Sequence, residues 1–99
     1  MPNKTPLDVV WTNNSILGSI AIKKYLLAKF SNKEVTVFHS LLKTFESAVS
    51  FFPELYPVSK KKIRRAVLNK NLSVFYRQNK NQIEVLAVLD NRMDLAEWI

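Results

Sequence analysis

The last third of the chain, residues 63–94, constrains the fold more than any other stretch because it has the pattern of three consecutive β-strands. Residues that favour strands, which are β-branched or aromatic, are concentrated in residues 72–77 and 82–89. Two Asn-Lys-Asn segments, residues 69–71 and 79–81, separate the runs, and asparagine favours tight turns. The sequence therefore predicts an antiparallel meander of three strands.

The alternation of side chains along a strand predicts which residues face the core. One face of the last strand carries four apolar residues, Ile83, Val85, Ala87 and Leu89. The opposite face is also largely apolar, so we expect this strand to be buried on both sides for most of its length. In the middle strand either Phe75 or Tyr76 must face the core. We assign the core position to Phe75 and a position at the rim to the Tyr76 hydroxyl.

A short strand and a helix are expected before this meander. Residues 7–11 have strand character, and the polar residues 12–15 offer several N-caps for a helix from about Ser15 to Phe30. Apolar residues form two lines along this helix, Ile16, Ile20 and Leu27 on one and Ile22, Leu26 and Phe30 on the other. A single packing surface needs only one stripe, so we expect this helix to contact both the sheet and a second element.

The clearest periodicity in the chain predicts a second helix. Its apolar residues recur at alternating spacings of three and four and share one face: Val35, Phe38, Leu42, Phe45, Val49 and Phe52. Ser31 and Glu34 have the capping-box spacing at its start, and Pro53 ends it. We expect an antiparallel helix hairpin packed on the meander, with residues 54–59 as a connecting loop. Residues 1–99 thus form one α+β domain, ordered as strand, two-helix hairpin and three-stranded antiparallel meander.

An excess of positive charge restricts the partners of this domain. Fifteen Lys and Arg residues against eight Asp and Glu residues give a net charge of +7. Such a charge favours nucleic acid, ribonucleoprotein or an acidic protein segment as a partner. Positive charge also serves solubility alone, and composition by itself does not separate the two roles.

The basic residues of the meander divide into two groups by position. Solvated charges that discourage edge pairing are expected at Lys61, Lys62 and Lys80. Target-binding residues, which would grip phosphates or carboxylates, are expected at four arginines within or at the ends of strands: Arg64, Arg65, Arg77 and Arg92. Arg92 follows the last strand, where we expect it to add little stability, and Asp90 is within reach of Arg92 or Arg64.

Several classes of site are excluded by what the sequence lacks. There is no cysteine for a disulfide or a thiolate metal site, and the only histidine, His39, is isolated on the second helix. A P-loop, a GxGxxG motif and a nucleophile elbow are absent, so no metal or other cofactor is expected. No apolar run approaches the roughly 20 residues that span a bilayer. The first residues lack the pattern of a signal peptide, and we expect a cytoplasmic protein.

Three segments of the meander resemble a known toxin family. These are IRRAV at residues 63–67, VFYR at residues 74–77 and IEVLAVLDNRMDL at residues 83–95. Together they are similar to the C-terminal half of the RelE/ParE toxin superfamily, and closer to its ParE-like branch. The sequence departs from the family pattern at Ala87, where the family often has a basic residue, and at Asp90, where it often has a histidine.

The resemblance implies a toxin of a type II toxin–antitoxin module, of the kind linked to plasmid stabilization. A ParE-like toxin inhibits growth by binding DNA gyrase and trapping its cleaved complex with DNA, so it needs no catalytic group of its own. Its neutralising partner would be a small acidic antitoxin that covers the basic face and the helix hairpin. A decayed toxin that only binds its antitoxin and regulates a promoter is an alternative.

The RNA-cleaving branch of the same fold implies a ribosome-dependent mRNA endonuclease instead. Its catalytic residues would come from six candidates: Arg64, Arg65, Lys70, Tyr76, Arg92 and Trp98. Arginine stays protonated, tryptophan is neither an acid nor a base, and lysine and tyrosine titrate far above neutrality. That branch also tends to have an arginine where Ser73 stands. We therefore favour the gyrase-binding, non-enzymatic interpretation.

Overall fold

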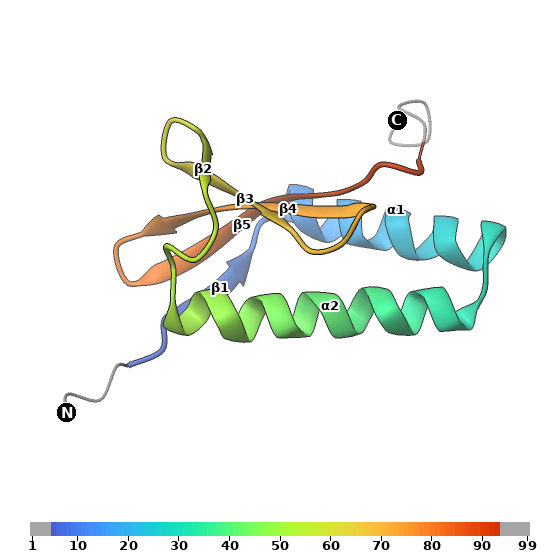
Figure 1. The fold of residues 1–99 in the computed structure, drawn as a ribbon, viewed down its shortest axis with the longest axis horizontal. Coiled ribbons are helices and arrows are strands. Elements are labelled where there is room, and N and C mark those ends of the chain that lie inside the picture. The colour runs from blue at the N-terminus through green and yellow to red at the C-terminus, as the bar shows by residue number, and fades with distance from the viewer. Residues whose placement is uncertain (1–4, 94–99) are drawn as a thin grey trace.

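The computed structural model of the protein describes residues 5–93 as a five-stranded sheet with two helices on one of its faces (Figure 1). The elements follow the order β1 (Asp8–Trp11), α1 (Asn13–Lys29), α2 (Asn32–Phe51), β2 (Val58–Lys60), β3 (Ile63–Val67), β4 (Leu72–Asn79) and β5 (Gln82–Asp90). The expected α+β architecture is therefore confirmed, including the helix hairpin and the meander β3–β4–β5. No helix among the described residues is long and apolar enough to cross a membrane.

The strands lie in the order β1-β5-β4-β3-β2, so the sheet is mixed rather than purely antiparallel. β1 pairs with β5 in parallel, and every other pair is antiparallel. The strand β2 was not expected, because residues 54–59 had only the character of a connection. Its three residues are all exposed, and pairing of Val58 with Arg64 and of Lys60 with Ile63 defines it. An exposed edge strand of this kind has no alternation of apolar and polar residues, so the sequence gives no signal that predicts it.

A β-bulge in β5 changes which of its residues face the core. Phe75 pairs with Ala87 but the next residue, Tyr76, pairs with Val85, so Leu86 is an extra residue between the two pairs. Beyond the bulge the alternation is reversed: Val88 and Asp90 are buried, whereas Leu89 is exposed. The expectation that Ala87 and Leu89 share the buried face of Ile83 and Val85 is therefore wrong.

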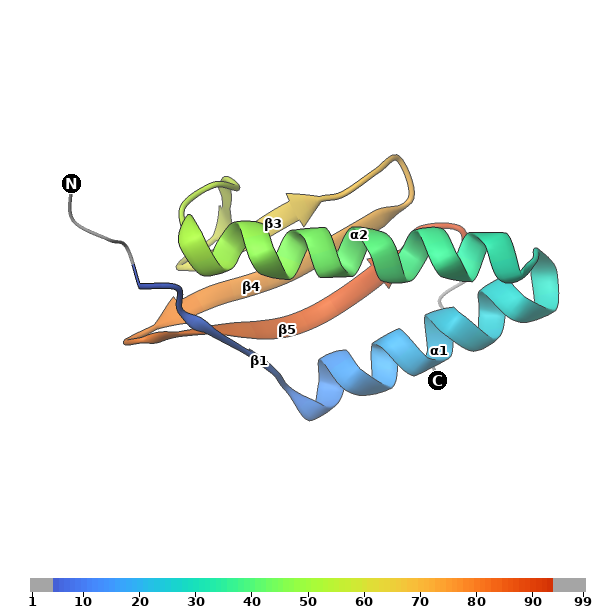
Figure 2. The ribbon, with the colours of Figure 1, turned by 90° about the horizontal axis from the view of Figure 1, so that it is seen from below.

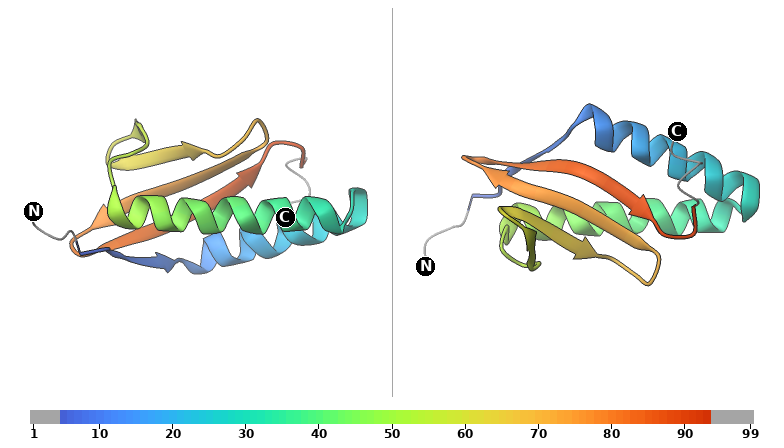
Figure 3. Two further views of the ribbon diagram at one scale, coloured as in Figure 1. Left: turned by 60° about the horizontal axis from the view of Figure 1, so that its bottom comes forward. Right: turned by 90° about the horizontal axis from the view of Figure 1, so that it is seen from above.

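The core lies between the sheet and the two helices. Figure 2 shows α2 across the strands and α1 beside β5. The periodic stripe of α2 is buried as expected at Val35, Phe38, Leu42, Phe45 and Val49. Phe52 is the exception: it follows the helix and is mostly exposed. The opposite face of the sheet has no helix over it (Figure 3, right).

Tyr76, rather than Phe75, occupies the core of β4. Its side chain is fully buried, its ring centre lies 5.4 Å from that of Phe45, and its hydroxyl donates a hydrogen bond of 2.8 Å to the carbonyl oxygen of Pro53. Phe75 faces the side without helices and pairs with Arg65 across β3. The assignment of Phe75 to the core and of the Tyr76 hydroxyl to the rim was wrong. A backbone carbonyl at the end of α2 satisfies the buried hydroxyl, which permits tyrosine there.

The first helix begins at Asn13, two residues earlier than expected, because Thr12 caps it. The Thr12 Oγ1 atom accepts a hydrogen bond of 3.2 Å from the backbone N–H of Ser15 and donates one of 2.8 Å to the carbonyl oxygen of Val85. Thr12 thereby fixes the start of α1 to β5. Of the two expected apolar lines, Ile22 and Leu26 are buried in the core. The other line has no covering element among residues 5–93.

Candidate functional site

The positive charge of the protein is concentrated in one segment. Residues 56–81, which form β2, β3, β4 and the turns around them, hold eight of the fifteen Lys and Arg residues and none of the eight Asp and Glu residues. The rest of the chain is close to electrical balance. The field that would attract an anionic partner therefore originates at the β2–β3–β4 side of the sheet.

Arg92, directly after β5, is held by two carboxylates and an aromatic ring. Its Nε and Nη2 atoms donate to the two carboxylate oxygens of Asp90 at 3.0 and 2.6 Å, and its Nη1 atom donates to Glu34 at 3.3 Å. The guanidinium carbon lies 4.8 Å from the centre of the Phe30 ring. The hydrogen bond to Asp90 raises the pKa of Arg92 further above its already high ordinary value. The group is a permanent cation in a fixed position.

The surroundings of Arg92 contradict the view that it adds little stability. Asp90 is only 2% exposed and the Arg92 side chain 22%, so the pair is largely out of water. Two backbone groups of Arg92 are used as well, since its N–H donates to Asp90 at 2.9 Å and its carbonyl oxygen accepts from the Tyr25 hydroxyl at 2.9 Å. Arg92 thus joins the end of β5 to α1 and α2. The expected reach of Asp90 to Arg92 is confirmed.

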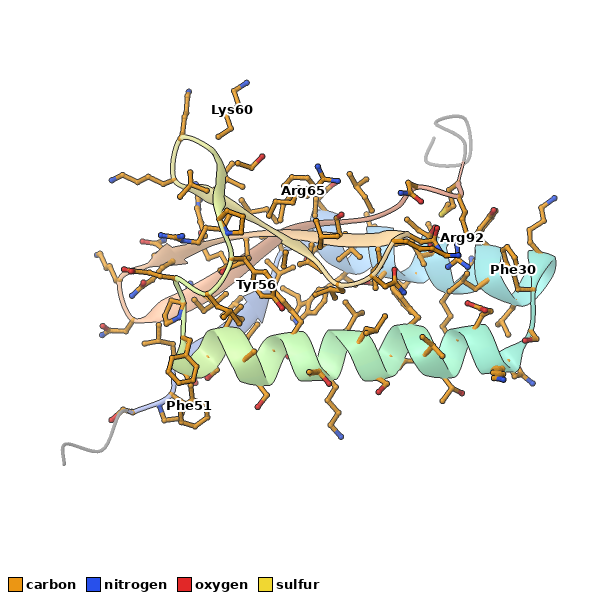
Figure 4. All side chains as sticks on the ribbon, in the orientation of Figure 1. Phe30, Phe51, Tyr56, Lys60, Arg65 and Arg92 are labelled. Atoms are coloured by element: carbon orange, nitrogen blue, oxygen red, sulfur yellow. The ribbon has the colours of Figure 1, made fainter. Side chains whose placement is uncertain are left out.

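Arg64 and Arg65 point to opposite sides of β3. Arg64 is partly buried, and its Nη1 atom donates a hydrogen bond of 2.8 Å to the carbonyl oxygen of Tyr56. Arg65 is exposed on the side without helices, as Figure 4 shows. Its guanidinium carbon lies 5.7 Å from the centre of the Phe75 ring, and its Nε and Nη2 atoms donate to Ser73 Oγ at 3.4 and 3.3 Å. Only Arg65 of these two presents its charge to solvent.

Arg77 lies at the other end of the sheet from Arg92, because it pairs with Glu84 near the β4–β5 turn. Its Nε atom donates to Glu84 Oε1 at 2.7 Å, and the amides of Asn79 and Gln82 donate to Oε2 at 3.2 and 3.4 Å. The hydrogen bond from Arg77 is the main reason that the pKa of Glu84 is lowered from its ordinary value. The four arginines expected to bind the target are therefore not gathered into one patch.

The candidates for a nuclease are also dispersed. Lys70 and Arg92 line one surface depression of about 710 Å³, together with Phe30, Glu34 and Val37. Arg64 and Arg65 do not line this depression, and Trp98 lies outside the described residues. Tyr76 is excluded from any surface chemistry because its side chain is fully buried, and this burial also raises the pKa of its hydroxyl. Among residues 5–93, no single place combines the six candidates.

Metal ligands are equally sparse in the described part of the chain. No group of three or more His, Cys, Asp or Glu side chains is arranged there to hold an ion. His39 is exposed on α2, and its ring packs 5.6 Å from that of Phe38. The features that the described residues offer for binding are fixed charges and apolar surface.

An apolar surface that lies apart from the arginines runs along α1. Ile16, Ile20 and Leu27 are each close to half exposed, and Leu17 is 66% exposed. The helix contains no acidic residue, and its exposed lysines include Lys23 and Lys24. An apolar stripe beside lysines complements a segment with apolar anchors and acidic flanks. The two apolar lines of this helix predicted contacts with the sheet and with a second element. The line that contains Ile16, Ile20 and Leu27 remains about half exposed.

The sequence interpretation missed two partners of Arg92. Glu34 was interpreted as a helix cap and Phe30 as an apolar face residue, yet both contact the guanidinium, Glu34 from the first turn of α2 and Phe30 from the C-cap of α1. Only the contact between Asp90 and Arg92 could be predicted from the sequence, because these residues are two positions apart. The contact of Arg92 with Glu34 joins positions 58 residues apart. No local pattern signals such a contact.

Comparison with known proteins bears on the fold. No family model matches the sequence, and no curated protein matches it. Among solved structures, the chain is similar to one from the chromosomal ParDE TA system of P. aeruginosa, with a TM-score of 0.73 at 12% identity over 87% of this chain and 97% of that one. A copper-bound mutant toxin from Helicobacter pylori gives a TM-score of 0.47 at 13% identity, over 87% and 96%. The first likeness supports the expected RelE/ParE-type toxin fold.

Proposed function

We propose that this chain is a ParE-like toxin of a type II toxin–antitoxin module, which inhibits DNA gyrase and is neutralised by a small acidic antitoxin in the cytoplasm. The observation that carries the proposal is the fold, shared over most of the chain with a component of a ParDE system. A fold alone hosts several activities, so the choice of target rests on the chemistry of the surface.

The surface chemistry favours binding over RNA cleavage. Cleavage at a ribose 2′-hydroxyl needs a proton acceptor and a proton donor beside the groups that stabilise charge. Arginine and lysine side chains in general are poor proton acceptors near neutrality, and Tyr76 is buried. A gyrase inhibitor needs only a complementary surface. Arg65 and the face of the sheet that no helix covers provide an exposed surface of this kind.

The acidic antitoxin is supported by the apolar stripe of α1. Ile16, Leu17, Ile20 and Leu27 present apolar area, and Lys23 and Lys24 add charge of one sign. Apolar burial supplies affinity that salt does not screen, while complementary charge speeds association and selects the partner. An amphipathic acidic segment laid along α1 would use both.

A ribosome-dependent mRNA endonuclease is the second candidate, and one observation favours it. Lys70, Arg92 and the carboxylate of Glu34 line the same depression. Glu34 is the one group there that could accept a proton, although it is paired with Arg92 at 3.3 Å. A decayed toxin that only binds an antitoxin would use the α1 stripe alone.

Expression of the chain without an antitoxin distinguishes the three alternatives. Growth should stop, purified protein should inhibit gyrase supercoiling and cause cleaved DNA to accumulate, and mRNA in a cell-free translation reaction should remain intact. Codon-positioned mRNA cuts with unaffected gyrase would refute the proposal in favour of the nuclease. Unaffected growth would favour the decayed toxin. Lys70→Gln is the matched variant, because it should abolish RNA cleavage but leave gyrase inhibition unchanged.

A further inference from the structure

The hairpin formed by β2 and β3 carries an unpaired cluster of positive charge. Lys60 ends β2, and Lys61 and Lys62 form the turn into β3. All three side chains are exposed, and none makes a hydrogen bond or an ion pair with another residue of the described range 5–93. Figures 1 and 4 show this hairpin rising from the sheet on the side away from α2, with Lys60 extended into solvent. We call residues 60–62 the cationic finger.

The backbone at the tip of the finger also favours a role for its charge. Lys61 has a φ of 54°, in the left-handed region that glycine and asparagine occupy at lower cost. The β4–β5 turn, at the same end of the sheet, likewise places Lys80 at a φ of 58°. Both turn positions therefore carry a lysine where glycine or asparagine would adopt the backbone conformation at lower cost.

Hydrogen bonds and ring packing fix the base of the finger, although the lysine side chains at its tip make no hydrogen bond or ion pair within residues 5–93. The backbone N–H of Arg65 donates to the carbonyl oxygen of Pro57 at 3.0 Å, and Arg64 is bonded to that of Tyr56. The Tyr56 ring in turn packs 6.2 Å from Phe45 in the core. A fixed base positions the backbone of the three lysines before a partner arrives, which lowers the entropic cost of binding.

Edge protection does not account for the whole finger. A lysine that prevents edge-to-edge pairing acts from the open side of an edge strand, and Lys60 on β2 is in that position. Lys61 and Lys62 are in the turn, where there is no open edge to protect. The sequence interpretation of these two lysines as edge charges therefore leaves them unexplained.

We propose that the cationic finger binds the phosphodiester backbone of nucleic acid, independently of the protein target. Lysines act as point charges that contact phosphates without reading sequence, whereas a protein interface needs apolar anchors. The three finger residues include no apolar side chain. Val58 is the only apolar residue of β2, whereas four exposed apolar residues are on α1. An acidic protein segment therefore fits α1, and a phosphate backbone fits the finger. This inference stands whether or not gyrase is the target.

Binding of fluorescein-labelled 20-mers to the full chain tests the proposal, with single-stranded DNA, duplex DNA and RNA as separate arms. The test variant carries Lys60→Gln, Lys61→Gln and Lys62→Gln. The matched control carries Lys23→Gln, Lys24→Gln and Lys43→Gln, which remove the same charge from exposed helix positions. Each phosphate contact adds about 0.7 to 0.9 to the slope of log affinity on log salt. The finger variant should therefore lose about 2 to 3 from this slope, and the control variant less than about 1.

Three results would overturn the proposal. The first is an equal loss of slope in both triple variants, which would mean that net charge alone drives binding. The second is no binding of wild-type protein to any of the three nucleic acids at about 50 mM salt. The third is equally tight binding of poly-glutamate of matched charge, which would assign the finger to an acidic protein. The arm with the tightest binding identifies the nucleic acid. Circular dichroism of both variants checks that each is folded.

Discussion

Replacing Arg92 by alanine should destabilise the fold substantially. The substitution leaves the Asp90 carboxylate, which is 2% exposed, with only a backbone N–H as partner, and it also removes the contacts with Glu34 and Phe30. Removing one member of a buried ion pair costs about 3 to 5 kcal/mol. The Arg92 side chain is 22% exposed, so water relieves part of this cost and the lower end, about 3 kcal/mol, applies.

Thermal and urea unfolding followed by circular dichroism measure this cost. For a domain of this size, about 3 kcal/mol corresponds to a fall in Tm of roughly 12 to 24 °C. Arg77→Ala is the matched control, because its ion pair with Glu84 is at the surface and its side chain is 48% exposed. That variant should lose only about 0.5 kcal/mol.

A double-mutant cycle separates the ion pair from the other contacts of Arg92. Asp90→Ala combined with Arg92→Ala should cost less than the sum of the single changes, by roughly 1 to 3 kcal/mol. If Arg92→Ala cost less than about 0.5 kcal/mol, the structural reasoning would be refuted and Arg92 would behave as an ordinary surface residue. Toxicity of this variant has to be compared at equal amounts of folded protein.

Three further predictions follow from single contacts. Tyr76→Phe should cost about 1 to 2 kcal/mol, measured by urea unfolding, because the carbonyl oxygen of Pro53 loses its buried donor, and toxicity should be unchanged. The pKa of Glu84 is lowered by Arg77, so their pair stabilises the fold at neutral pH and loses this effect as the pH falls through the lowered pKa. Glu84→Gln should therefore show a shallower fall of Tm than wild type between about pH 5 and 3, and an equal fall would contradict this. Ile20→Asp should change stability by no more than about 0.5 kcal/mol but prevent neutralisation by the proposed antitoxin in a growth assay; continued neutralisation would argue against the α1 stripe as its binding site.

The sequence predicts those parts of the fold whose signals are local. The α2 stripe, the two Asn-Lys-Asn turns and the meander all depend on neighbours a few residues apart, and each is present. The bulge at Leu86 was not predictable, because a one-residue insertion is visible only against the partner strand. Tyr76 was misplaced because its hydroxyl bonds a carbonyl oxygen 23 residues away.

The candidate site was less predictable than the fold for the same reason. Residue type and strand position identified Arg65 as a cation, but they could not show that Arg65 is exposed whereas Arg64 and Arg92 are partly buried and hydrogen-bonded to a carbonyl oxygen and a carboxylate. The binding role was also assigned to the arginines of the meander rather than to the lysines of the β2–β3 turn. Lys61 and Lys62, which were expected to be solvated edge charges, are unpaired within the described residues, whereas the four arginines make hydrogen bonds or ion pairs.

The parallel pairing of β1 with β5 has a consequence for how a nascent chain acquires its fold. The hydrogen bond from Thr12 Oγ1 to the carbonyl oxygen of Val85 joins residues 73 positions apart, whereas the α1–α2 hairpin and the meander close over short loops. Contacts over long separations form late, because the loop they close must first be ordered. β1 therefore has to wait, with its edge unpaired, until β5 has been synthesised. A chain interrupted before Gln82 lacks the strand that both β1 and β4 pair with, so we expect a stalled synthesis to yield an unfolded fragment rather than a partly folded domain.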